Sequence, residues 1–302
     1  MMTNGHWFGE AAGRVLAVAF VASAAMVAPA QADERVAFRS LDGALALTAY
    51  LHRPARAEPA PAIVMLHGCS GLGTSAGPFA LYRDWRDFLA DKGYVTLMVD
   101  SAASRGLGQT CTDADLAARM WKERPADAYA GLAFLQSQPF VIADKVALIG
   151  WSQGGGVVLE TIATHGLGRP NPLPAQDFAA AIAFYPGLCS KTAQAAHLDA
   201  PRGTWTTSIP LLVLQGEADN WTPAKPCAAF LSDTQARQAP VTFQIYPGAS
   251  HSFDAPDMPI HAVERYRRGD WAPIEGTNEE ARADARDRAA RFLAGRLGAK
   301  AP

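Results

Sequence analysis

Residues suited to nucleophilic chemistry lie at the centre of this chain, in Gly150-Trp151-Ser152-Gln153-Gly154. The spacing G-x-S-x-G is typical of a nucleophile elbow, a strand-to-helix turn so tight that the serine hydroxyl stands clear of the sheet. The positions two before and two after the serine must be very small, because a side chain there would strike the turn. The apolar run Val146–Ile149 precedes the pattern and a helical run follows it. We therefore predict that Ser152 is a nucleophile rather than part of a structural turn.

A serine nucleophile needs a base to take its proton and a group that orients the base. Asp219 and His251 each follow an apolar segment with the pattern of a strand, Pro210–Gly216 and Val241–Tyr246 respectively. Functional groups of open α/β sheets gather beyond the carboxyl ends of the strands, so we expect both side chains near the serine. The chain order Ser152, Asp219, His251 is the order of a Ser-Asp-His triad on such a sheet.

Other titratable residues are less well placed. Glu217 lies two residues before Asp219 in the same turn and is a candidate for a supporting carboxylate. His165 and His197 follow no strand end, and His261 lies deeper in an irregular segment.

An oxyanion formed at the serine would need two backbone amides as hydrogen-bond donors. We expect one from Gln153, directly after the serine, where the N-terminus of the following helix also favours negative charge. We expect the second from the glycine-rich loop 67–71, which follows the apolar segment Ala62–His67. Within that loop the amide of Cys69 is the best candidate.

Apolar segments bounded by Gly, Pro and Asp alternate with helical segments along the chain. Fully apolar strands between helices are typical of a mostly parallel sheet, here of about eight strands, with helices on both faces. Two irregular segments remain: 166–176 should be a stiff surface loop, and 255–277 either folds over the site or merely connects elements. The predicted strands are 34–39, 45–52, 62–67, 94–100, the run before Ser152, 179–185, 210–216 and 241–246, and the predicted helices are 79–92, 113–138 with Pro125 as a possible break, the segment after Ser152, and 278–297.

The first 32 residues are predicted to be a signal peptide. Arg14 precedes the apolar run Val15–Val27, and Ala30-Gln31-Ala32 is a small-x-small cleavage pattern. This run is too short to cross a bilayer comfortably, and no later segment approaches ~18 consecutive apolar residues. We expect an exported, soluble product, periplasmic or secreted, without a stable membrane anchor. Residues 33–302 should form one α/β domain.

The charge pattern limits the partners of the chain. The formal net charge is -2, and cleavage after Ala32 leaves it unchanged because Glu10 and Arg14 are both removed. No basic cluster is present, which argues against nucleic acid or an anionic membrane surface as a partner. A small molecule is the expected partner, and the sequence leaves the oligomeric state open.

All four cysteines follow the predicted cleavage site. An even number of cysteines in an exported chain favours disulfides, for which three connectivities exist. Metal binding is the weaker interpretation, because no C-x-x-C or H-x-x-x-H spacing accompanies the cysteines. Adjacent strand ends would bring their loops together in pairs, which predicts the bridges Cys69–Cys111 and Cys189–Cys227.

From about Ala62 to Leu297 the chain resembles the dienelactone hydrolase family of α/β-hydrolases, in its exported branch. The resemblance implies the α/β-hydrolase fold and an acyl-enzyme mechanism that requires neither a metal nor an organic cofactor. It rests on His67-Gly-Cys-Ser-Gly71, Asp100-Ser-Ala-Ala-Ser-Arg-Gly106, Gly150-Trp-Ser-Gln-Gly-Gly155, Phe184-Tyr-Pro-Gly187, Gly216-Glu-Ala-Asp-Asn-Trp-Thr-Pro223 and Tyr246-Pro-Gly-Ala-Ser-His-Ser-Phe-Asp254.

The chain departs from the namesake enzymes of that family at the nucleophile. They carry cysteine in G-x-C-x-G, whereas this chain has Ser152. A thiolate suits an activated cyclic enol ester, and a serine with a histidine base suits ordinary carboxylic esters. Arg105 lies where the namesake enzymes place an arginine that binds a substrate carboxylate, or it pins the loop after Asp100.

Three alternatives to a carboxylic esterase remain. A serine peptidase would use the same triad, although the mature length leaves little room for a specificity domain. A lipid or polymer esterase would use residues 255–277 to shape its groove. A non-catalytic binding protein is disfavoured because all three triad positions are filled.

Overall fold

The computed structural model describes residues 1–5, 33–166, 168–198 and 200–298. Most of the predicted signal peptide, residues 6–32, lies outside the described residues. Within them, no helix combines the length and the apolar character needed to cross a membrane.

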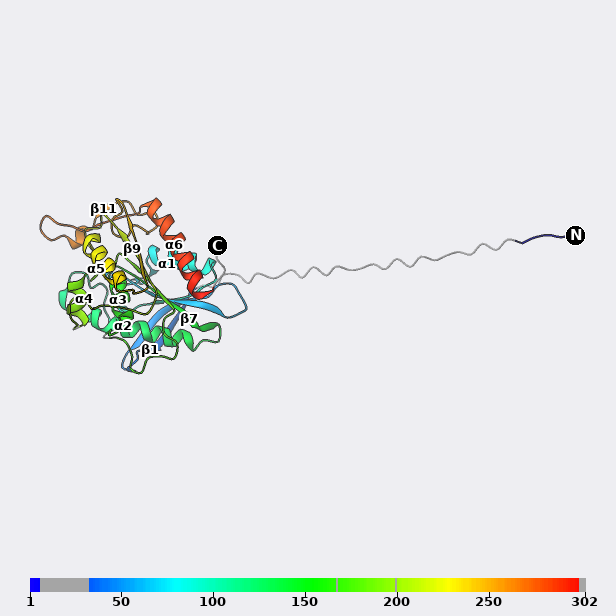
Figure 1. The fold of residues 1–302 in the computed structure, drawn as a ribbon, viewed down its shortest axis with the longest axis horizontal. Coiled ribbons are helices and arrows are strands. Elements are labelled where there is room, and N and C mark those ends of the chain that lie inside the picture. The colour runs from blue at the N-terminus through cyan, green and yellow to red at the C-terminus, as the bar shows by residue number, and fades with distance from the viewer. Residues whose placement is uncertain (6–32, 167, 199, 299–302) are drawn as a thin grey trace.

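An eight-stranded sheet runs through the structure in the order β1-β2-β6-β3-β7-β8-β9-β10 (Figure 1). β2 pairs antiparallel with β1 and β6, and the other neighbours pair in parallel. The strands are β1 (Glu34–Arg39), β2 (Ala46–His52), β3 (Ala60–Leu66), β6 (Val95–Val99), β7 (Val141–Trp151), β8 (Ala180–Phe184), β9 (Leu211–Gly216) and β10 (Val241–Tyr246). The predicted eight-stranded, mostly parallel sheet is therefore confirmed.

Helices cover both faces of the sheet because alternate strand side chains point to opposite faces. In β3, Val64 packs into one hydrophobic cluster and Ile63 and Met65 into the other. α2, α3 and α5 close the first cluster, and α1 and α6 close the second (Figure 1). The helices are α1 (Ala80–Asp91), α2 (Ala114–Gln136), α3 (Gln153–Ile162), α4 (Lys191–Leu198), α5 (Ala224–Ala236) and α6 (Glu279–Leu297).

The ends of the two long helices follow from local sequence. The carboxylate of Asp113 accepts hydrogen bonds from the amides of Asp115 and Leu116, which caps α2, and Asn278 caps α6 in the same way. Pro125 lies inside α2 without ending it, so the break that the sequence suggested does not occur. Helices α4 and α5 were not among the predicted elements.

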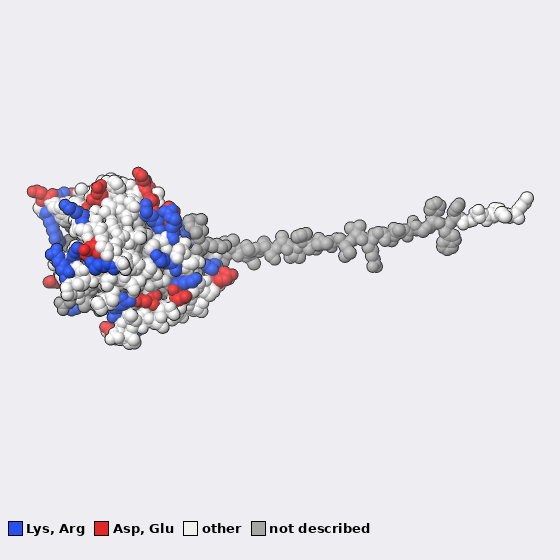
Figure 2. Space-filling view, viewed as in Figure 1, with Lys and Arg blue, Asp and Glu red and all other residues white. Residues whose placement is uncertain are grey.

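Two short hairpins project from the loops. β4 (Gly73–Thr74) pairs with β5 (Gly77–Pro78), and β11 (His261–Ala262) pairs with β12 (Ile274–Glu275). On the face drawn in Figure 2, Lys and Arg side chains are interspersed with Asp and Glu, as the small net charge suggests.

The elbow glycines allow α3 to pack against the sheet at very short distance. A Cβ atom on Gly154 would lie 2.2 Å from the backbone oxygen of Leu66 in β3. A Cβ atom on Gly150 would lie 2.2 Å from the oxygen of Gly154. Both neighbours are backbone atoms, which cannot move aside without displacing a strand or the helix start.

We expect Gly154→Ala to lower the free energy of unfolding by about 3 kcal/mol or more, because the added methyl overpacks the junction of β3 and α3. Gly295→Ala in α6 is the matched control, since nothing lies within 4 Å of the position. That change should be neutral or stabilise by ~0.5–1 kcal/mol through helix propensity. Chemical denaturation measures both, and equal effects at the two positions would contradict the packing argument.

Candidate active site

Ser152 stands on a strained turn between β7 and α3. Its backbone has φ 54° and ψ −114°, a region that a residue with a Cβ rarely adopts and that costs about 1–3 kcal/mol. The turn is fixed to the end of β8: the Ser152 amide donates to the Phe184 carbonyl at 3.0 Å, and the Gly187 amide donates to the Ser152 carbonyl at 2.9 Å. Strain held by such surroundings is typical of functional sites.

A cavity of about 380 Å³ opens beside this turn. Ser152, Gln153 and Cys69 all line it, so the structure brings the predicted nucleophile together with both predicted sources of oxyanion amides. Trp221 and Thr222, from the turn that contains Asp219, line it as well. The volume lies within the range of small-molecule sites.

Local structure fixes the two candidate oxyanion amides in position. Gln153 is the first residue of α3, where an amide has no acceptor inside the helix. In the loop after β3, the amide of Gly68 donates to the Tyr82 hydroxyl at 2.8 Å, and the carbonyl of Cys69 accepts from the Thr110 amide at 2.7 Å. These bonds fix the peptide units on both sides of the Cys69 amide.

Arg124 of α2 links the same two segments from inside the protein. Its side chain is fully buried, and its two terminal nitrogens donate to the Gln153 side-chain oxygen at 3.0 Å and to the His67 carbonyl at 2.6 Å. Burial lowers the pKa of Arg124 to about 10, so the guanidinium stays charged at neutral pH. A positive charge therefore lies directly behind the candidate oxyanion site. Sequence reasoning missed this residue, because nothing in the pattern of α2 separates it from a surface arginine.

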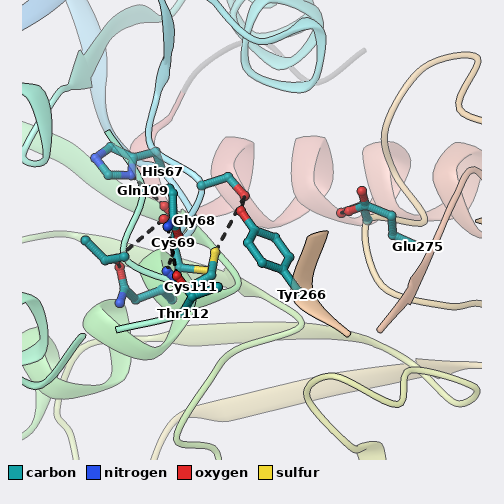
Figure 3. Close-up of a disulfide and its surroundings, with 12 residues drawn as sticks. His67, Gly68, Cys69, Gln109, Cys111, Thr112, Tyr266 and Glu275 are labelled. Carbon is teal, nitrogen blue, oxygen red and sulfur yellow. Dashed lines mark hydrogen bonds between the residues drawn. A yellow bond between two sulfur atoms is a disulfide. The ribbon is translucent and has the colours of Figure 1, made fainter. Parts of the chain in front are cut away.

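Both predicted disulfides are present, Cys69–Cys111 and Cys189–Cys227. The first joins the loop after β3 to the segment that precedes α2. Figure 3 shows the Tyr266 ring directed toward this loop, where its hydroxyl lies 3.1 Å from that of Ser70. The second ties the loop after β8 to α5.

Residues 255–277 contact the residues around the site. Their hairpin, β11 and β12, is anchored at Asn220, whose side chain donates to the Ala272 carbonyl and accepts from the Ile274 amide. Its Tyr266 ring packs against Trp221, with ring centroids 5.3 Å apart. None of its residues is among the described residues that line the cavity.

His251 and Asp219 form a buried pair, with the Nδ1 atom of His251 2.7 Å from a carboxylate oxygen of Asp219. The other Asp219 oxygen accepts from the amides of Trp221 and Thr222 at 2.8 and 2.9 Å. The Thr222 hydroxyl donates to the first oxygen at 2.7 Å. Burial acts to raise the pKa of Asp219, but the charge of His251 and these hydrogen bonds outweigh it and hold the pKa below the ordinary value.

Aromatic rings fix the plane of the His251 imidazole. The rings of Tyr185 and Trp221 lie with their centroids 4.5 and 4.8 Å from that of His251. Tyr185 directly follows Phe184, whose carbonyl binds the Ser152 amide, so one short segment at the end of β8 contacts both the serine turn and the histidine.

Asp254 connects the serine turn to the histidine loop through one buried carboxylate. One oxygen accepts from the indole N–H groups of Trp85 and Trp151 at 2.7 and 2.8 Å, and the other accepts from the Tyr185 hydroxyl at 2.7 Å. Trp151 precedes Ser152, and Asp254 follows His251 by three residues. Burial raises the pKa of Asp254 even though all three donors act to lower it. The residue closes the segment 246–254 of the family resemblance, which was the sequence signal for it.

Arg105 does not line the cavity beside Ser152. Its guanidinium donates to both carboxylate oxygens of Asp127, at 2.8 and 2.9 Å, to Glu123 at 2.6 Å and to the Ser101 carbonyl at 2.8 Å. These partners occupy the guanidinium and neutralise its charge. The bond to the Ser101 carbonyl corresponds to the alternative interpretation, in which Arg105 pins the loop after Asp100.

The remaining candidates lie outside the cavity wall. The Glu217 carboxylate is exposed and accepts from the Gly248 amide at 3.3 Å. Across the described ranges, no group of three or more His, Cys, Asp or Glu residues is arranged to hold a metal ion.

The strand order and the strand-elbow-helix unit, with helices on both faces, define an α/β-hydrolase. The chain belongs to the dienelactone hydrolase family, whose model matches residues 47–297, and this confirms the resemblance seen in the sequence.

Three solved structures show the same fold. The dienelactone hydrolase-like promiscuous phosphotriesterase P91 from metagenomic libraries is 21% identical with a TM-score of 0.62, covering 88% of this chain and 99% of its own. A putative dienelactone hydrolase from Klebsiella pneumoniae subsp. pneumoniae MGH 78578 is 20% identical with a TM-score of 0.60, covering 87% and 99%. Thermogutta terrifontis esterase 2, phosphorylated by paraoxon, is 20% identical with a TM-score of 0.61, covering 89% and 96%.

We expect Asp254→Leu to cost at least about 3 kcal/mol of stability and to lower turnover, because three buried donors lose their acceptor. Asp254→Asn is the matched control: its oxygen can accept from both indoles while its amide donates to the Tyr185 hydroxyl.

The pH dependence of stability separates these variants further. Burial raises the pKa of Asp254 in the folded state. The free energy of unfolding that this shift contributes is therefore present at low pH and is lost as the pH rises through the folded-state pKa. Asp254→Asn should lack this decline in urea unfolding measured across acidic pH. Full activity and stability of Asp254→Leu would contradict the argument that Asp254 connects the serine turn to the histidine loop.

Proposed function

We propose that this chain is an exported serine hydrolase that cleaves carboxylic esters through an acyl-enzyme. One observation carries the proposal: Ser152, on its strained turn, shares a cavity wall with Gln153, Cys69 and Thr222, and the Thr222 hydroxyl contacts the buried His251–Asp219 pair. Family membership supports hydrolase chemistry, and the serine favours ordinary esters over the substrates of a cysteine nucleophile.

In the proposed reaction the Ser152 hydroxyl attacks the ester carbonyl while His251 takes its proton. Asp219 holds the imidazole by its Nδ1–H and stabilises the charged form. The amides of Gln153 and Cys69 donate to the oxyanion, and the positive charge of Arg124 behind them favours its formation. His251 then protonates the leaving alcohol and activates a water molecule that hydrolyses the acyl-enzyme. No metal or organic cofactor is needed for these steps.

Export is part of the proposal. It rests on the signal-peptide pattern of residues 1–32, and the two disulfides are compatible with an oxidising compartment. Residues 33–302 are proposed to be the mature domain.

The alternatives differ in substrate. A peptidase would cleave amides of matched acyl groups, a lipid or polymer esterase would prefer aggregated over dissolved esters, and a binding protein would cleave neither. Hydrolysis of p-nitrophenyl esters, compared with the matching p-nitroanilides and with emulsified triglycerides, separates all three from the proposal.

We expect a fluorophosphonate probe or paraoxon to label the purified mature protein on Ser152. Ser152→Ala should abolish labelling and lower kcat by up to ~10⁶, since the nucleophile itself is lost. Ser190→Ala is the control: Ser190 also lines the cavity, but its hydroxyl accepts from the Ala193 amide as a helix cap. Intact-mass spectrometry and ester turnover are the readouts. Labelling of Ser152→Ala, or its loss in Ser190→Ala alone, would refute the assignment.

Activity on a neutral ester should rise from acid to neutral pH and then plateau, because only the neutral imidazole of His251 accepts the serine proton. The lowered pKa of Asp219 keeps this carboxylate ionised across that range, so the rise reports on the imidazole. The same lowered pKa gives stability that is present above the ordinary carboxyl range and is lost as the pH falls through the folded-state pKa.

Asp219→Asn should therefore lower kcat by about 10⁴ and remove this acid-side loss of stability. Glu217→Gln, in the same turn but exposed, serves as the control and should change neither the rate profile nor the acid unfolding. A flat rate from acid to neutral pH in the unmodified enzyme would overturn the assignment of His251.

A further inference from the structure

The cavity beside Ser152 has a wall without formal charge. Its seventeen lining residues, all within the described part of the chain, include no Asp, Glu, Lys, Arg or His. Two indole rings, of Trp121 and Trp221, stand in this wall together with Leu188, Pro186 and Pro226. Two disulfide bridges add their sulfur atoms to it through Cys69, Cys111 and Cys189.

Three cations near the cavity, Arg105, Lys191 and Arg124, are bound to other groups of the protein. Arg105 is held by Asp127 and Glu123, and Lys191 at the start of α4 pairs with Asp233 at 2.9 Å. Arg124 lies behind Gln153 with its terminal nitrogens bonded inside the protein, and the charge of Asp127 acts on it. None of these three cations is among the described residues that line the cavity.

A substrate carboxylate placed in this cavity would lose water without gaining a cationic partner, because no Lys, Arg or His is among the described residues that line it. Burying a charge in that way is strongly unfavourable, whereas apolar and aryl groups gain from contact with indole and aliphatic surface. The cavity thus selects against charge on whichever part of the ester enters it.

From these observations we infer that the enzyme acts on uncharged small-molecule esters and discriminates against esters whose acyl or alcohol part carries a carboxylate. The inference rests on the proposed function, which it deepens by naming the substrate class. It separates this chain from relatives that recognise a substrate carboxylate with arginine, since its own Arg105 is neutralised outside the cavity.

The test compares matched ester pairs. On the acyl side, p-nitrophenyl butyrate is compared with p-nitrophenyl hemisuccinate, which has the same number of acyl carbons and a terminal carboxylate; the methyl ester of the latter controls for length. On the alcohol side, methyl 4-acetoxybenzoate is compared with 4-acetoxybenzoate. Each enzymatic rate is corrected for the rate without enzyme, which includes attack of the hemisuccinate carboxylate on its own ester, and each kcat/KM is divided by the rate constant for hydroxide hydrolysis of that ester. We expect the neutral member of at least one pair to be favoured roughly 10- to 100-fold, the factor for leaving one buried polar group unpaired.

A cation added to the wall should weaken the preference for the neutral ester. Ala193 of α4 lines the cavity, so Ala193→Lys should narrow the ratio by about tenfold or more. Thr192→Lys, one position earlier on the same helix and exposed, should leave the ratio unchanged. The double variant Arg105→Gln with Asp127→Asn should also leave the ratio unchanged, because it removes both charges of that ion pair together and Glu123 keeps its ion pair with Arg119.

The possible outcomes distinguish an error in the substrate class from an error in the proposed function. Equal or faster turnover of the carboxylate member in both pairs overturns the substrate class while the esterase assignment stands. If the Arg105 double variant lost turnover of the hemisuccinate but kept that of the neutral esters, Arg105 would be a substrate ligand and the inference would be wrong. Absence of turnover on every ester, together with no labelling of Ser152, would instead overturn the proposed function.

Discussion

One buried carboxylate, that of Asp254, joins parts of the site that lie far apart in the chain. Its two oxygens accept from ring donors on α1, at the end of β7 and just after β8, while its own backbone continues from the His251 loop. A carboxylate without solvent is stable only when such donors surround it. The geometry of the serine turn and the histidine loop is therefore set by the same satisfied polar group, and displacement of either would leave donors unpaired in the core.

Two fixed charges lie behind the positions where charge would develop in the proposed reaction. The Arg124 guanidinium lies behind Gln153, where negative charge would develop, and the Asp219 carboxylate lies behind His251, where positive charge would develop. Both charges are held by several hydrogen bonds and need not reorganise as the reaction proceeds. Such preorganisation is the largest contribution to catalysis in many enzymes of this kind. The reacting centre itself opens on an uncharged wall, so the field comes from behind the site rather than from its surface.

Much of this architecture was predictable from sequence, because the signals were local. The all-apolar strands, the elbow glycines around Ser152 and the strand-end positions of Asp219 and His251 each depend on a few neighbouring residues. The cysteine pairing followed from the order of adjacent strand ends. Sequence could not predict the partners that packing selects. Arg105 lies in the loop after Asp100 and Arg124 in the helix that follows, yet Arg124 binds the oxyanion loop and Arg105 binds Asp127. Position along the chain does not determine which way a long side chain turns.

The two disulfides lie in the wall of the cavity rather than at a distance from it. The shape of the cavity therefore depends on the redox state of these cysteines. The loop that carries the Cys69 amide is fixed on one side by its bond to Cys111, and the segment beyond β8 is fixed by the bond from Cys189 to Cys227. A chain folded where thiols stay reduced would have its sheet and its serine turn, but two of the walls that shape the pocket would lack their covalent anchors. Oxidation of the four cysteines would thus complete the cavity as well as stabilise the fold, so the cavity would be assembled in full only in a compartment where both bridges can form.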